Sequence, residues 1–421
     1  MSEWSLVCHI SAESGGVVAI VSGDGGRFRV QQLPVAEASG RGAERRPLFI
    51  GAGQDRLGAW VLDPEARKIV SHKALPSDAF PIYSYRDPDG QHVWFVSDGD
   101  EETGNDPLNC ADQGSPVIVV RNSGQSAELS RIICAGRGHH VVTFTAPTRN
   151  HPDLLRRAFV SNLLDGSICV VGHDPQDSSS YLQVLDTINL AEPDKDEEGA
   201  NGVPNNAFPH GQVYSDVTGL IYSLSNGYGS ISVIDPRNNA IVNRMVMKKS
   251  SNLLLSPDGR YLIGKGADRK SNAEHVLGIL SVADIRSNKV VHSIEVPDFY
   301  PSVYRFSPDG SRLYVTSAAT GKGAQHKNLK KNVVRVYDAT KLPALELLRE
   351  VQVGVADCGR RPLAFLAPGG KPVYVFIPNP SDGTLTILDG RSDQVLETVS
   401  IGPGNAEEVN FSFWDGTTYG A

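Results

Sequence analysis

The sequence predicts an all-β fold, a β-propeller, on the basis of two repeated patterns. In the first, two short apolar runs flank a tight turn, most clearly at residues 253–263 and 304–315, where both turns read Ser-Pro-Asp-Gly. Proline fixes φ and glycine accepts a positive φ, which suits a turn between antiparallel strands. In the second, a further strand follows the pair and often ends at an aspartate, such as Asp235 or Asp338. Four antiparallel strands repeated about seven times are typical of a β-propeller.

The repeat accounts for most of the chain. We expect one domain over residues 1–421, with regular blades over 80–414 and a divergent first blade over 1–75. The last repeat has only a first strand, at 409–414, whereas the N-terminal region has surplus strands. The sequence therefore predicts seven four-stranded blades, with the C-terminal strand completing the first blade, because ring closure removes exposed sheet edges. The alternative is that the N-terminal strands form an eighth blade. Third strands are predicted at residues 60–63, 117–120, 168–171, 231–235, 279–282, 334–338 and 385–389.

Composition and charge narrow the classes of partner. The net charge is −8 and the sequence pI is near 5.8, which disfavours nucleic acid because nucleic-acid binding requires a basic surface. No polybasic segment indicates a membrane surface, and no apolar run approaches the length of a membrane span. We expect a small-molecule partner, no nucleic acid and no membrane, and a monomer or small homo-oligomer.

The cysteines and the first residues bear on the compartment. The chain has five cysteines and no CxxC pair. Three of them, Cys8, Cys134 and Cys169, lie in apolar strand-like runs, where a thiol usually acts as a small buried hydrophobic group. This pattern does not indicate a disulfide framework, and the sequence as given starts without a basic and apolar leader. A cytoplasmic protein is the expectation.

Several segments of the repeat resemble those of a known superfamily. They are residues 159–162 with 166–171, residues 222–226 with 229–235, and the Ser-Pro-Asp-Gly turns. These resemble the YVTN-repeat β-propellers, which are related to the cytochrome d1-like and lactonase-like seven-bladed propellers. The resemblance implies the fold over about residues 80 to 414. It leaves the function open, because such propellers include enzymes, cofactor-assembly proteins and binding scaffolds.

A functional site is expected where the first strands of the blades begin. In propellers of this kind the first strands line a central channel, and their starts and the loops between second and third strands open on one face. Two neighbouring copies carry imidazoles there, His139 and His140 in one and His210 in the next. Adjacent side chains on a strand point to opposite faces. We therefore expect only one of His139 and His140 to face the channel, at the same height as His210.

The candidate residues fall into three groups. Imidazole is a common ligand for zinc, copper and iron and a common acid or base, so the histidines are candidates for both roles. The adjacent arginines 360 and 361 could bind a carboxylate or phosphate, or could pair with Asp357 instead. One loop between second and third strands also carries Lys265 and Asp268. The predicted catalytic residues are His139, His140, His210, Arg361 and Glu408; the substrate-binding residues are Tyr83, Asn162, Asn226, Arg269, Tyr304 and Arg360; and the metal ligands are His140, His210, His275 and His326.

Three functions remain open at this point. The first is a small-molecule enzyme, redox or hydrolytic, with its site at the channel mouth and with histidines that act directly or bind a divalent copper, zinc or iron ion. The second is a lactonase-like hydrolase that needs no metal. The third is a non-catalytic scaffold that binds a ligand or a protein. The sequence contains no Gly-x-Ser-x-Gly, HExxH or CxxCH motif that would identify the reaction.

Overall fold

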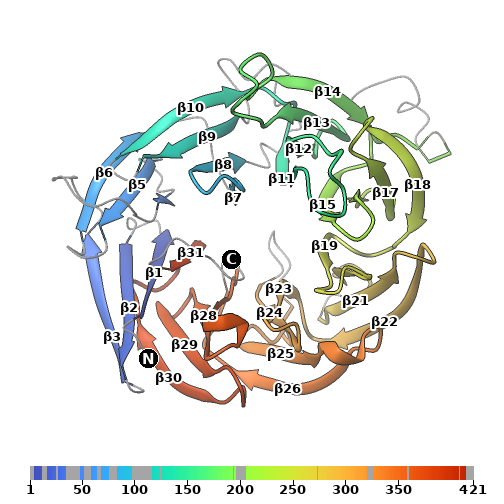
Figure 1. Cartoon of the computed structure of the whole chain (residues 1–421). Coiled ribbons are helices and arrows are strands. Elements are labelled where there is room, and N and C mark those ends of the chain that lie inside the picture. The colour runs from blue at the N-terminus through green and yellow to red at the C-terminus, as the bar shows by residue number, and fades with distance from the viewer. Residues whose placement is uncertain are drawn as a thin grey trace.

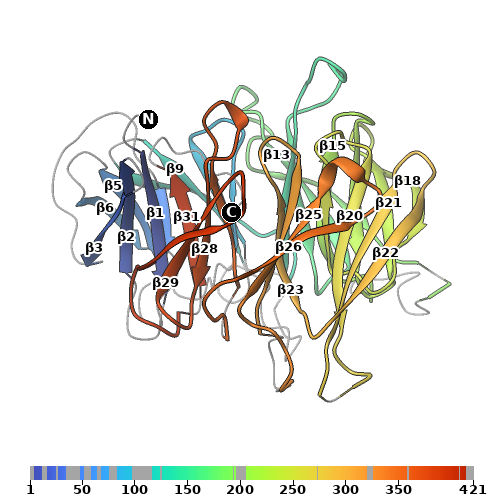
Figure 2. The same ribbon diagram turned by 90° about the horizontal axis from the view of Figure 1, so that it is seen from below.

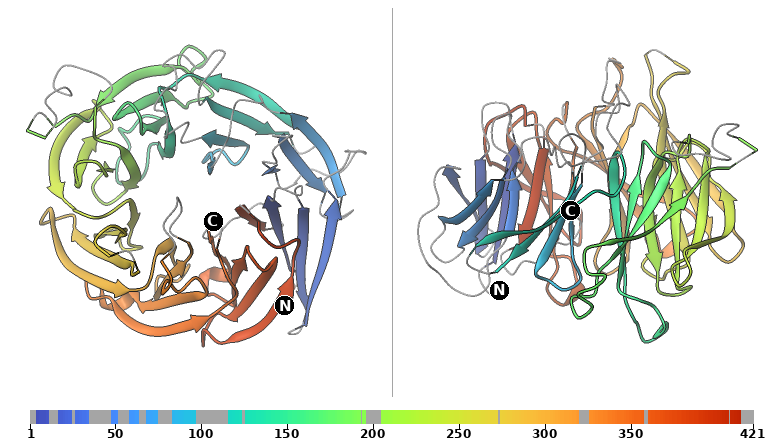
Figure 3. Two further views of the ribbon diagram at one scale, coloured as in Figure 1. Left: turned by 180° about the vertical axis from the view of Figure 1, so that it is seen from behind. Right: turned by 90° about the horizontal axis from the view of Figure 1, so that it is seen from above.

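The protein is a ring of antiparallel β-sheets around a central axis (Figure 1). The computed structural model describes residues 4–11, 17–24, 27–34, 48–51, 58–63, 68–74, 83–96, 116–123, 126–192, 194–195, 205–272, 274–319, 326–357, 360–406 and 408–413. Within these residues the sheets stand side by side around the ring, as the side and rear views show (Figures 2 and 3). No helix of the described chain is long and apolar enough to cross a membrane. The all-β propeller predicted from the sequence is confirmed.

Seven sheets have four strands, as predicted, and in each the first strand of the repeat is innermost. Six of them are continuous in sequence. Their strands are β7 (Tyr83–Arg86), β8 (His92–Val96), β9 (Val117–Asn122) and β10 (Ala127–Ile133); β11 (His139–Thr145), β12 (Arg157–Asn162), β13 (Ser167–Gly172) and β14 (Val184–Asn189); β15 (Pro209–Ser215), β16 (Leu220–Ser225), β17 (Ser230–Asp235) and β18 (Ala240–Val246); β19 (Asn252–Leu255), β20 (Tyr261–Asp268), β21 (Leu277–Asp284) and β22 (Lys289–Pro297); β23 (Pro301–Phe306), β24 (Arg312–Ser317), β25 (Val333–Asp338) and β26 (Glu346–Gln352); β27 (Ala364–Leu366), β28 (Tyr374–Asn379), β29 (Thr384–Asp389) and β30 (Val395–Ser400). Two short 3-10 turns, η1 (Ala339–Lys341) and η2 (Pro368–Gly370), lie between strands.

The seventh four-stranded sheet closes the ring. It joins β1 (Trp4–Ser11), β2 (Val17–Asp24) and β3 (Arg27–Pro34) to the C-terminal strand β31 (Glu408–Phe413), which is innermost. In the register of β1 with β31, Cys8 stands opposite Phe411 and Ile10 opposite Val409. The predicted closure by the C-terminal strand is therefore confirmed.

The N-terminal region contributes one sheet more than a single divergent blade would. Strands β4 (Leu48–Gly51), β5 (Gly58–Asp63) and β6 (Lys68–Ala74) form a separate three-stranded sheet. It stands between the closing sheet and the β7–β10 sheet (Figure 1). The ring thus has the seven predicted four-stranded blades and an additional smaller sheet. The alternative, in which the N-terminal strands form an eighth blade of their own, is not found, because β1 to β3 belong to the closing blade.

The hydrophobic core lies between neighbouring sheets. Where the closing sheet meets the β27–β30 sheet, Leu6, Phe376 and Phe411 are all buried in one cluster. The middle strands carry continuous runs of buried apolar residues, such as residues 117–120, so each blade buries side chains on both of its faces. This arrangement fixes the radial position of every inner strand.

The outermost strands share a local irregularity. In seven sheets the register skips one residue of the outermost strand, which marks a β-bulge. A bulge increases the twist of an edge strand and interrupts its free hydrogen-bonding edge, which opposes pairing with another chain. The bulge residues include exposed apolar side chains, for example Val242 at 53 % exposure. The skipped residues are Val70, Ser130, Leu185, Val242, Val291, Leu348 and Leu396.

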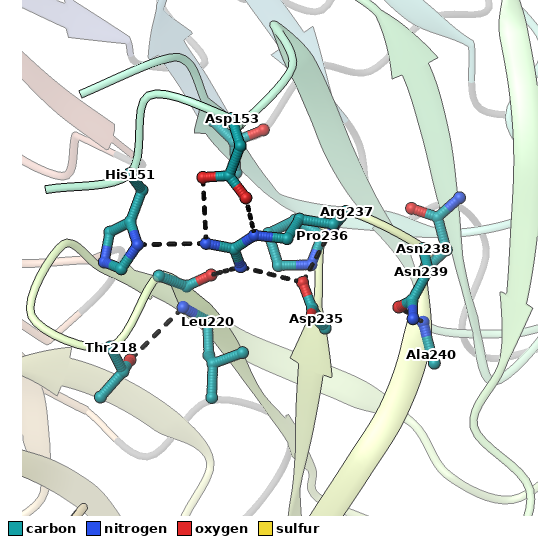
Figure 4. Close-up of polar contacts among 12 residues, drawn as sticks. His151, Asp153, Thr218, Leu220, Asp235, Pro236, Arg237, Asn238, Asn239 and Ala240 are labelled. Carbon is teal, nitrogen blue, oxygen red and sulfur yellow. Dashed lines mark hydrogen bonds and ion pairs between the residues drawn. The ribbon is translucent and has the colours of Figure 1, made fainter. Parts of the chain in front are cut away.

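Polar contacts also connect neighbouring blades on the face opposite the strand starts. Arg237, in the turn between β17 and β18, donates to Asp153 and approaches the Nδ1 atom of His151 at 3.1 Å (Figure 4). A more buried contact joins the β23–β26 and β27–β30 blades, where the Tyr314 hydroxyl donates to Asp393 at 2.5 Å. Such charge-assisted contacts fix the angle between adjacent blades.

The cysteines follow the sequence interpretation only in part. Cys8 and Cys169 are buried free thiols, as expected for small core residues. Cys134 is disulfide-bonded, which the sequence interpretation did not foresee. Its side chain is exposed at the end of β10, so the expected role of a buried hydrophobic group is wrong for this residue.

Replacing Phe411 by alanine tests the closure. We expect Phe411→Ala to lower the free energy of unfolding by about 3–5 kcal/mol, because it removes a buried ring from the last strand of the ring. Urea denaturation followed by tryptophan fluorescence measures this change. Asn410→Ala on the same strand is the control, since Asn410 is only half-buried. Equal effects of the two substitutions would show that β31 does not close the core.

Candidate functional site

Six side chains from six consecutive blades gather around the ring axis, and we call them the central cluster. Tyr83 begins β7, His140 is the second residue of β11 and His210 the second of β15. Lys265 in β20 stands opposite Asn252, the first residue of β19, so it lies at the same end of the ring. The other two members are Arg305 in β23 and Arg360, which precedes β27. The central cluster is Tyr83, His140, His210, Lys265, Arg305 and Arg360.

The aromatic members of the cluster form a continuous arc. The ring centroids of His140 and His210 are 3.7 Å apart, with an angle of 37° between the ring planes. On its other side, His140 meets the Tyr83 ring edge to face at 4.4 Å. His140 is buried, whereas His210 and Tyr83 are half-buried. The arc therefore leaves part of His210 open to solvent or to a ligand.

Arg360 connects the arc to the opposite side of the ring. Its Cζ atom lies 5.3 Å from the centroid of the Tyr83 ring, a cation–π contact. Tyr83 belongs to the β7–β10 sheet and Arg360 precedes β27, and two other sheets separate these blades along the ring. The contact therefore spans the centre of the molecule and is a consequence of ring closure.

Lys265 is held in place by the neighbouring blade. Its Nζ donates to the backbone oxygens of Pro301 at 3.2 Å and Ser302 at 2.5 Å. The same Nζ lies 5.7 Å from the centroid of the Tyr304 ring. Tyr304 is buried, and its hydroxyl donates to the backbone oxygen of Ile263. These contacts fix the lysine amine next to the inner strand β23, which also carries Arg305.

Burial and mutual repulsion shift the pKa values of the cluster. Burial, followed by the positive charges of Arg360 and Arg305, lowers the pKa of Lys265 to about 7. Burial, followed by Arg360, lowers the pKa of Arg305 to about 10. Burial, followed by Arg360 and Lys265, lowers the pKa of His140 to about 3, so this imidazole is neutral at physiological pH. The cluster concentrates positive charge in a sheltered place.

The two adjacent histidines point to different surroundings. His140 stacks on His210, while His139 turns into its own blade, where its Nδ1 lies 2.9 Å from Oδ1 of Asn162. The Asn162 amide donates to the backbone oxygen of Ala135. Both His139 and Asn162 are fully buried. The structure therefore places these two predicted site residues inside a blade and away from the arc.

The two arginines before β27 point in different directions. Arg361 is fully buried, and its guanidinium donates to the backbone oxygens of Lys331 and Gly354. Burial lowers the pKa of Arg361 to about 9. The alternative pairing with Asp357 is not formed, because Lys331 takes that carboxylate. Arg360 joins the central cluster and Arg361 does not.

The remaining predicted residues lie on surrounding loops. His275 pairs with Asp298 at 2.7 Å and is exposed, while His326 contacts the backbone oxygen of Arg269 at 3.2 Å. The Arg269 side chain is exposed and lies over the Tyr300 ring. Asn226 is half-buried in the turn between β16 and β17. Glu408 begins β31, but its side chain lies outside the described residues.

The structure does not assemble the predicted four-histidine metal site. Among the described residues, no group of three or more potential ligands includes His140, His210, His275 or His326. His275 is paired with Asp298, and His326 contacts the backbone oxygen of Arg269. A different group, Asp87, Asp89 and His92, has ligand atoms within 4.8 Å of one another and could hold a metal ion.

Protein contacts already occupy much of this acidic group. Asp87 accepts from the Trp94 indole at 3.0 Å and pairs with His173 at 2.6 Å. Asp89 accepts from the backbone of the following turn and contacts Nδ1 of His92. These contacts connect the β7–β8 turn with the next blade. They account for the geometry of the group as a structural element.

Sequence reasoning missed two members of the cluster as site residues. Lys265 was placed on a loop and not selected, since β20 extends further than the repeat predicted. Arg305 was overlooked, although a charge within the otherwise uncharged strand Pro301–Phe306 is the signal that could have revealed it. Both residues lie near the other members of the central cluster only because the ring is closed.

Comparison with known proteins identifies the fold. No family model matches the chain, and no curated protein matches it. Among solved structures, the dihydro-heme d1 dehydrogenase NirN in complex with DHE is 14% identical, with a TM-score of 0.60, over 96% of this chain and 74% of that one. A putative 6-phosphogluconolactonase from Bacteroides fragilis is 13% identical, with a TM-score of 0.53, over 97% and 98% of the two chains. The hydrazine synthase of Kuenenia stuttgartiensis is 17% identical, with a TM-score of 0.53, over 79% and 94%.

The chain shares the propeller fold of these proteins. The resemblance predicted from the repeat is thereby confirmed at the level of the fold. The neighbours include enzymes of different kinds. At these identities the likeness extends to the fold alone, and the function must be argued from the central cluster.

Replacing His140 tests the electrostatics of the cluster. In the unfolded chain this imidazole takes up a proton near pH 6.5, whereas in the folded protein it does so only at about pH 3. Stability is therefore lost as the pH falls below about 6.5, by at most about 1.4 kcal/mol per pH unit from this one group. We expect His140→Phe to reduce this acid-side loss in urea denaturation series, whereas His292→Asn on the outer strand β22 leaves it unchanged. An unaltered pH dependence in His140→Phe would contradict the assignment.

Proposed function

We propose that the protein is a small-molecule enzyme that binds an anionic substrate at the central cluster and hydrolyses an ester or lactone bond in it. The convergence of His140, His210, Lys265, Arg305 and Arg360 from five blades carries this proposal. The substrate would lie at the end of the ring where the inner strands begin. Acid–base groups and cations would then act on the same molecule.

The charge of the cluster supports an anionic ligand. Burial is the main cause of the lowered pKa values of Lys265 and Arg305, and repulsion from the neighbouring positive charges adds to it. A carboxylate or phosphate group would offset it and would accept charge-assisted hydrogen bonds from the same side chains. The overall charge of the chain is −8, so the positive centre is a local feature and not a reflection of the composition.

The imidazole pair supports acid–base chemistry. His210 is half-buried and stacked on a neutral imidazole, so the orientation of its ring is fixed. A neutral imidazole can take a proton from water that attacks an ester carbonyl. The neighbouring cations would stabilise the negative charge that develops on the carbonyl oxygen. This chemistry requires no metal ion.

Anion binding is tested with citrate and inorganic phosphate as probes. We expect Lys265→Met and Arg360→Met each to weaken binding by about tenfold or more in isothermal titration calorimetry at constant ionic strength, since each removes a charge-assisted contact. Lys289→Met on the outer strand β22 is the control and should bind like the parent protein. Equal affinities of all three variants would contradict the proposed site.

The same titration has an expected pH dependence. Bound anion favours protonated Lys265, whose pKa in the free protein is about 7, so affinity should fall as the pH rises from 6 to 9. In Lys265→Arg the charge persists throughout this range, and the fall should be much smaller. A parallel fall in both proteins would show that another group is responsible.

Catalysis is tested on a panel of carboxylate-bearing esters and lactones. We expect His210→Gln to reduce kcat/KM by about 100-fold or more, in the range typical for loss of a general base, with citrate affinity largely retained. A chelator should leave the activity of the parent protein unchanged. Loss of activity with chelator would favour the metal-dependent alternative, and Asp87, Asp89 and His92 would then be the ligands to examine.

A further inference from the structure

We propose that Lys265 is also a nucleophile, which forms a reversible imine with the carbonyl group of a 2-oxo acid whose carboxylate is bound by Arg305 and Arg360. This inference rests on the proposed anion site and adds a reaction to it. In the proposed function Lys265 only binds an anion through its charge, whereas here it also forms a covalent bond with the substrate. Three features support it: the position of the Lys265 amine, the two arginines that would bind the carboxylate, and the protonation state of the amine.

Two hydrogen bonds to the backbone hold the amine of Lys265 in place and leave one of its three N–H directions for a ligand. Two of its hydrogens are donated to the backbone oxygens of Pro301 and Ser302. Among the described residues no protein acceptor takes the third. A neutral amine has two hydrogens and one lone pair. If the third proton leaves, both carbonyl contacts persist and the lone pair takes the open direction.

The anchor is the pair of arginines. Arg305 follows Tyr304 on the strand whose start holds the lysine amine. Arg360, from the next blade, lies near enough for its charge to act on both Lys265 and Arg305. A guanidinium binds a carboxylate more strongly than it binds a neutral oxygen. In a 2-oxo acid the carbonyl carbon is bonded directly to the carboxylate carbon. Binding the carboxylate at the arginines would therefore bring the electrophilic carbon towards Lys265.

The proton balance favours reaction near neutral pH. The same two arginines that anchor the acid contribute to lowering the pKa of Lys265 to about 7. A lysine that is sheltered from water and placed next to another cation is an established way to obtain a nucleophilic amine. The half-buried Lys265 meets both conditions, whereas an exposed lysine such as Lys249 meets neither.

The step itself is balanced without a further reactant. The Nζ lone pair attacks the carbonyl carbon and forms a C–N bond, while the carbonyl oxygen takes a proton and becomes the hydroxyl of a carbinolamine. Loss of that hydroxyl as water, with one proton from nitrogen, gives the imine. The overall change is amine plus ketone to imine plus water, and no group is oxidised or reduced.

Trapping with pyruvate tests the proposal. The folded protein is incubated with pyruvate and sodium cyanoborohydride, which reduces an imine to a stable secondary amine, and the adduct is located by peptide mass spectrometry. We expect a single dominant adduct at Lys265 and at least a tenfold lower yield in Arg360→Met. The trapping rate in the parent protein should rise with pH through about 7, following the free amine.

Matched variants separate the possible outcomes. Lys249→Met replaces an exposed lysine that lies 3.8 Å from Asp268, close to the end of β20, and should leave the adduct unchanged. Lys265→Arg keeps the charge and should lose the adduct while still binding lactate, which has the carboxylate of pyruvate but no carbonyl. Adducts spread over exposed lysines, with no preference for Lys265, would overturn the imine proposal.

Lactate binding distinguishes this inference from the proposed function. If lactate binds in an Arg360-dependent manner but pyruvate yields no adduct at Lys265, the imine is refuted and the anion site stands. If neither lactate nor citrate binds, the anion site is refuted and the imine proposal falls with it. If Lys265 only holds the two blades together, its replacement would lower the stability of the protein. In that case the parent protein would give no adduct with pyruvate.

Discussion

The pairing of β1 with β31 is the constraint on which the rest of the structure depends. It joins the last strand to the first three, so that the blades form a ring. Because the ring is closed, the starts of successive inner strands lie around one axis. Residues separated by almost 280 positions, such as Tyr83 and Arg360, come into contact there. Without closure the central cluster would consist of unrelated side chains on separate sheets.

Closure also explains why the centre of the ring is electrostatically unusual. Each of these blades contributes one side chain near the axis, and nothing in the repeat prevents several of these from being basic. The ring then holds Lys265, Arg305 and Arg360 near one another. Burial, followed by the charges of Arg360 and Arg305, lowers the pKa of Lys265, and burial, followed by Arg360, lowers the pKa of Arg305. On the face opposite the strand starts, Arg237 pairs with Asp153 and Arg312 with Asp393. A concentration of like charge that persists in a folded protein is commonly found at a functional site.

The repeat made the fold predictable, but it made the site predictable only in part. Strand alternation and turn chemistry are local, and so the blades, the closing strand and the inward position of one of two adjacent histidines followed from short windows of sequence. The direction of Arg361 did not, because it depends on the backbone oxygens of Lys331 and Gly354 in the adjacent blade. The sequence likewise predicts His275 and His326 as metal ligands. In the structure His275 pairs with Asp298, and His326 contacts the backbone oxygen of Arg269, and neither contact can be read from the sequence. The extra sheet β4–β6 and the bulges of the outer strands depend on how blades pack, which a single sequence does not record.

The central claim is that the cationic groups around the ring axis exist to bind an anion. A crystal structure of the protein equilibrated with selenate tests it most directly, since the anomalous signal of selenium locates a tetrahedral anion without ambiguity. The account predicts a strong anomalous peak within hydrogen-bonding distance of Lys265, Arg305 and Arg360, beside His210. Absence of that peak, with these three side chains instead paired to carboxylates of the chain itself, would contradict the account.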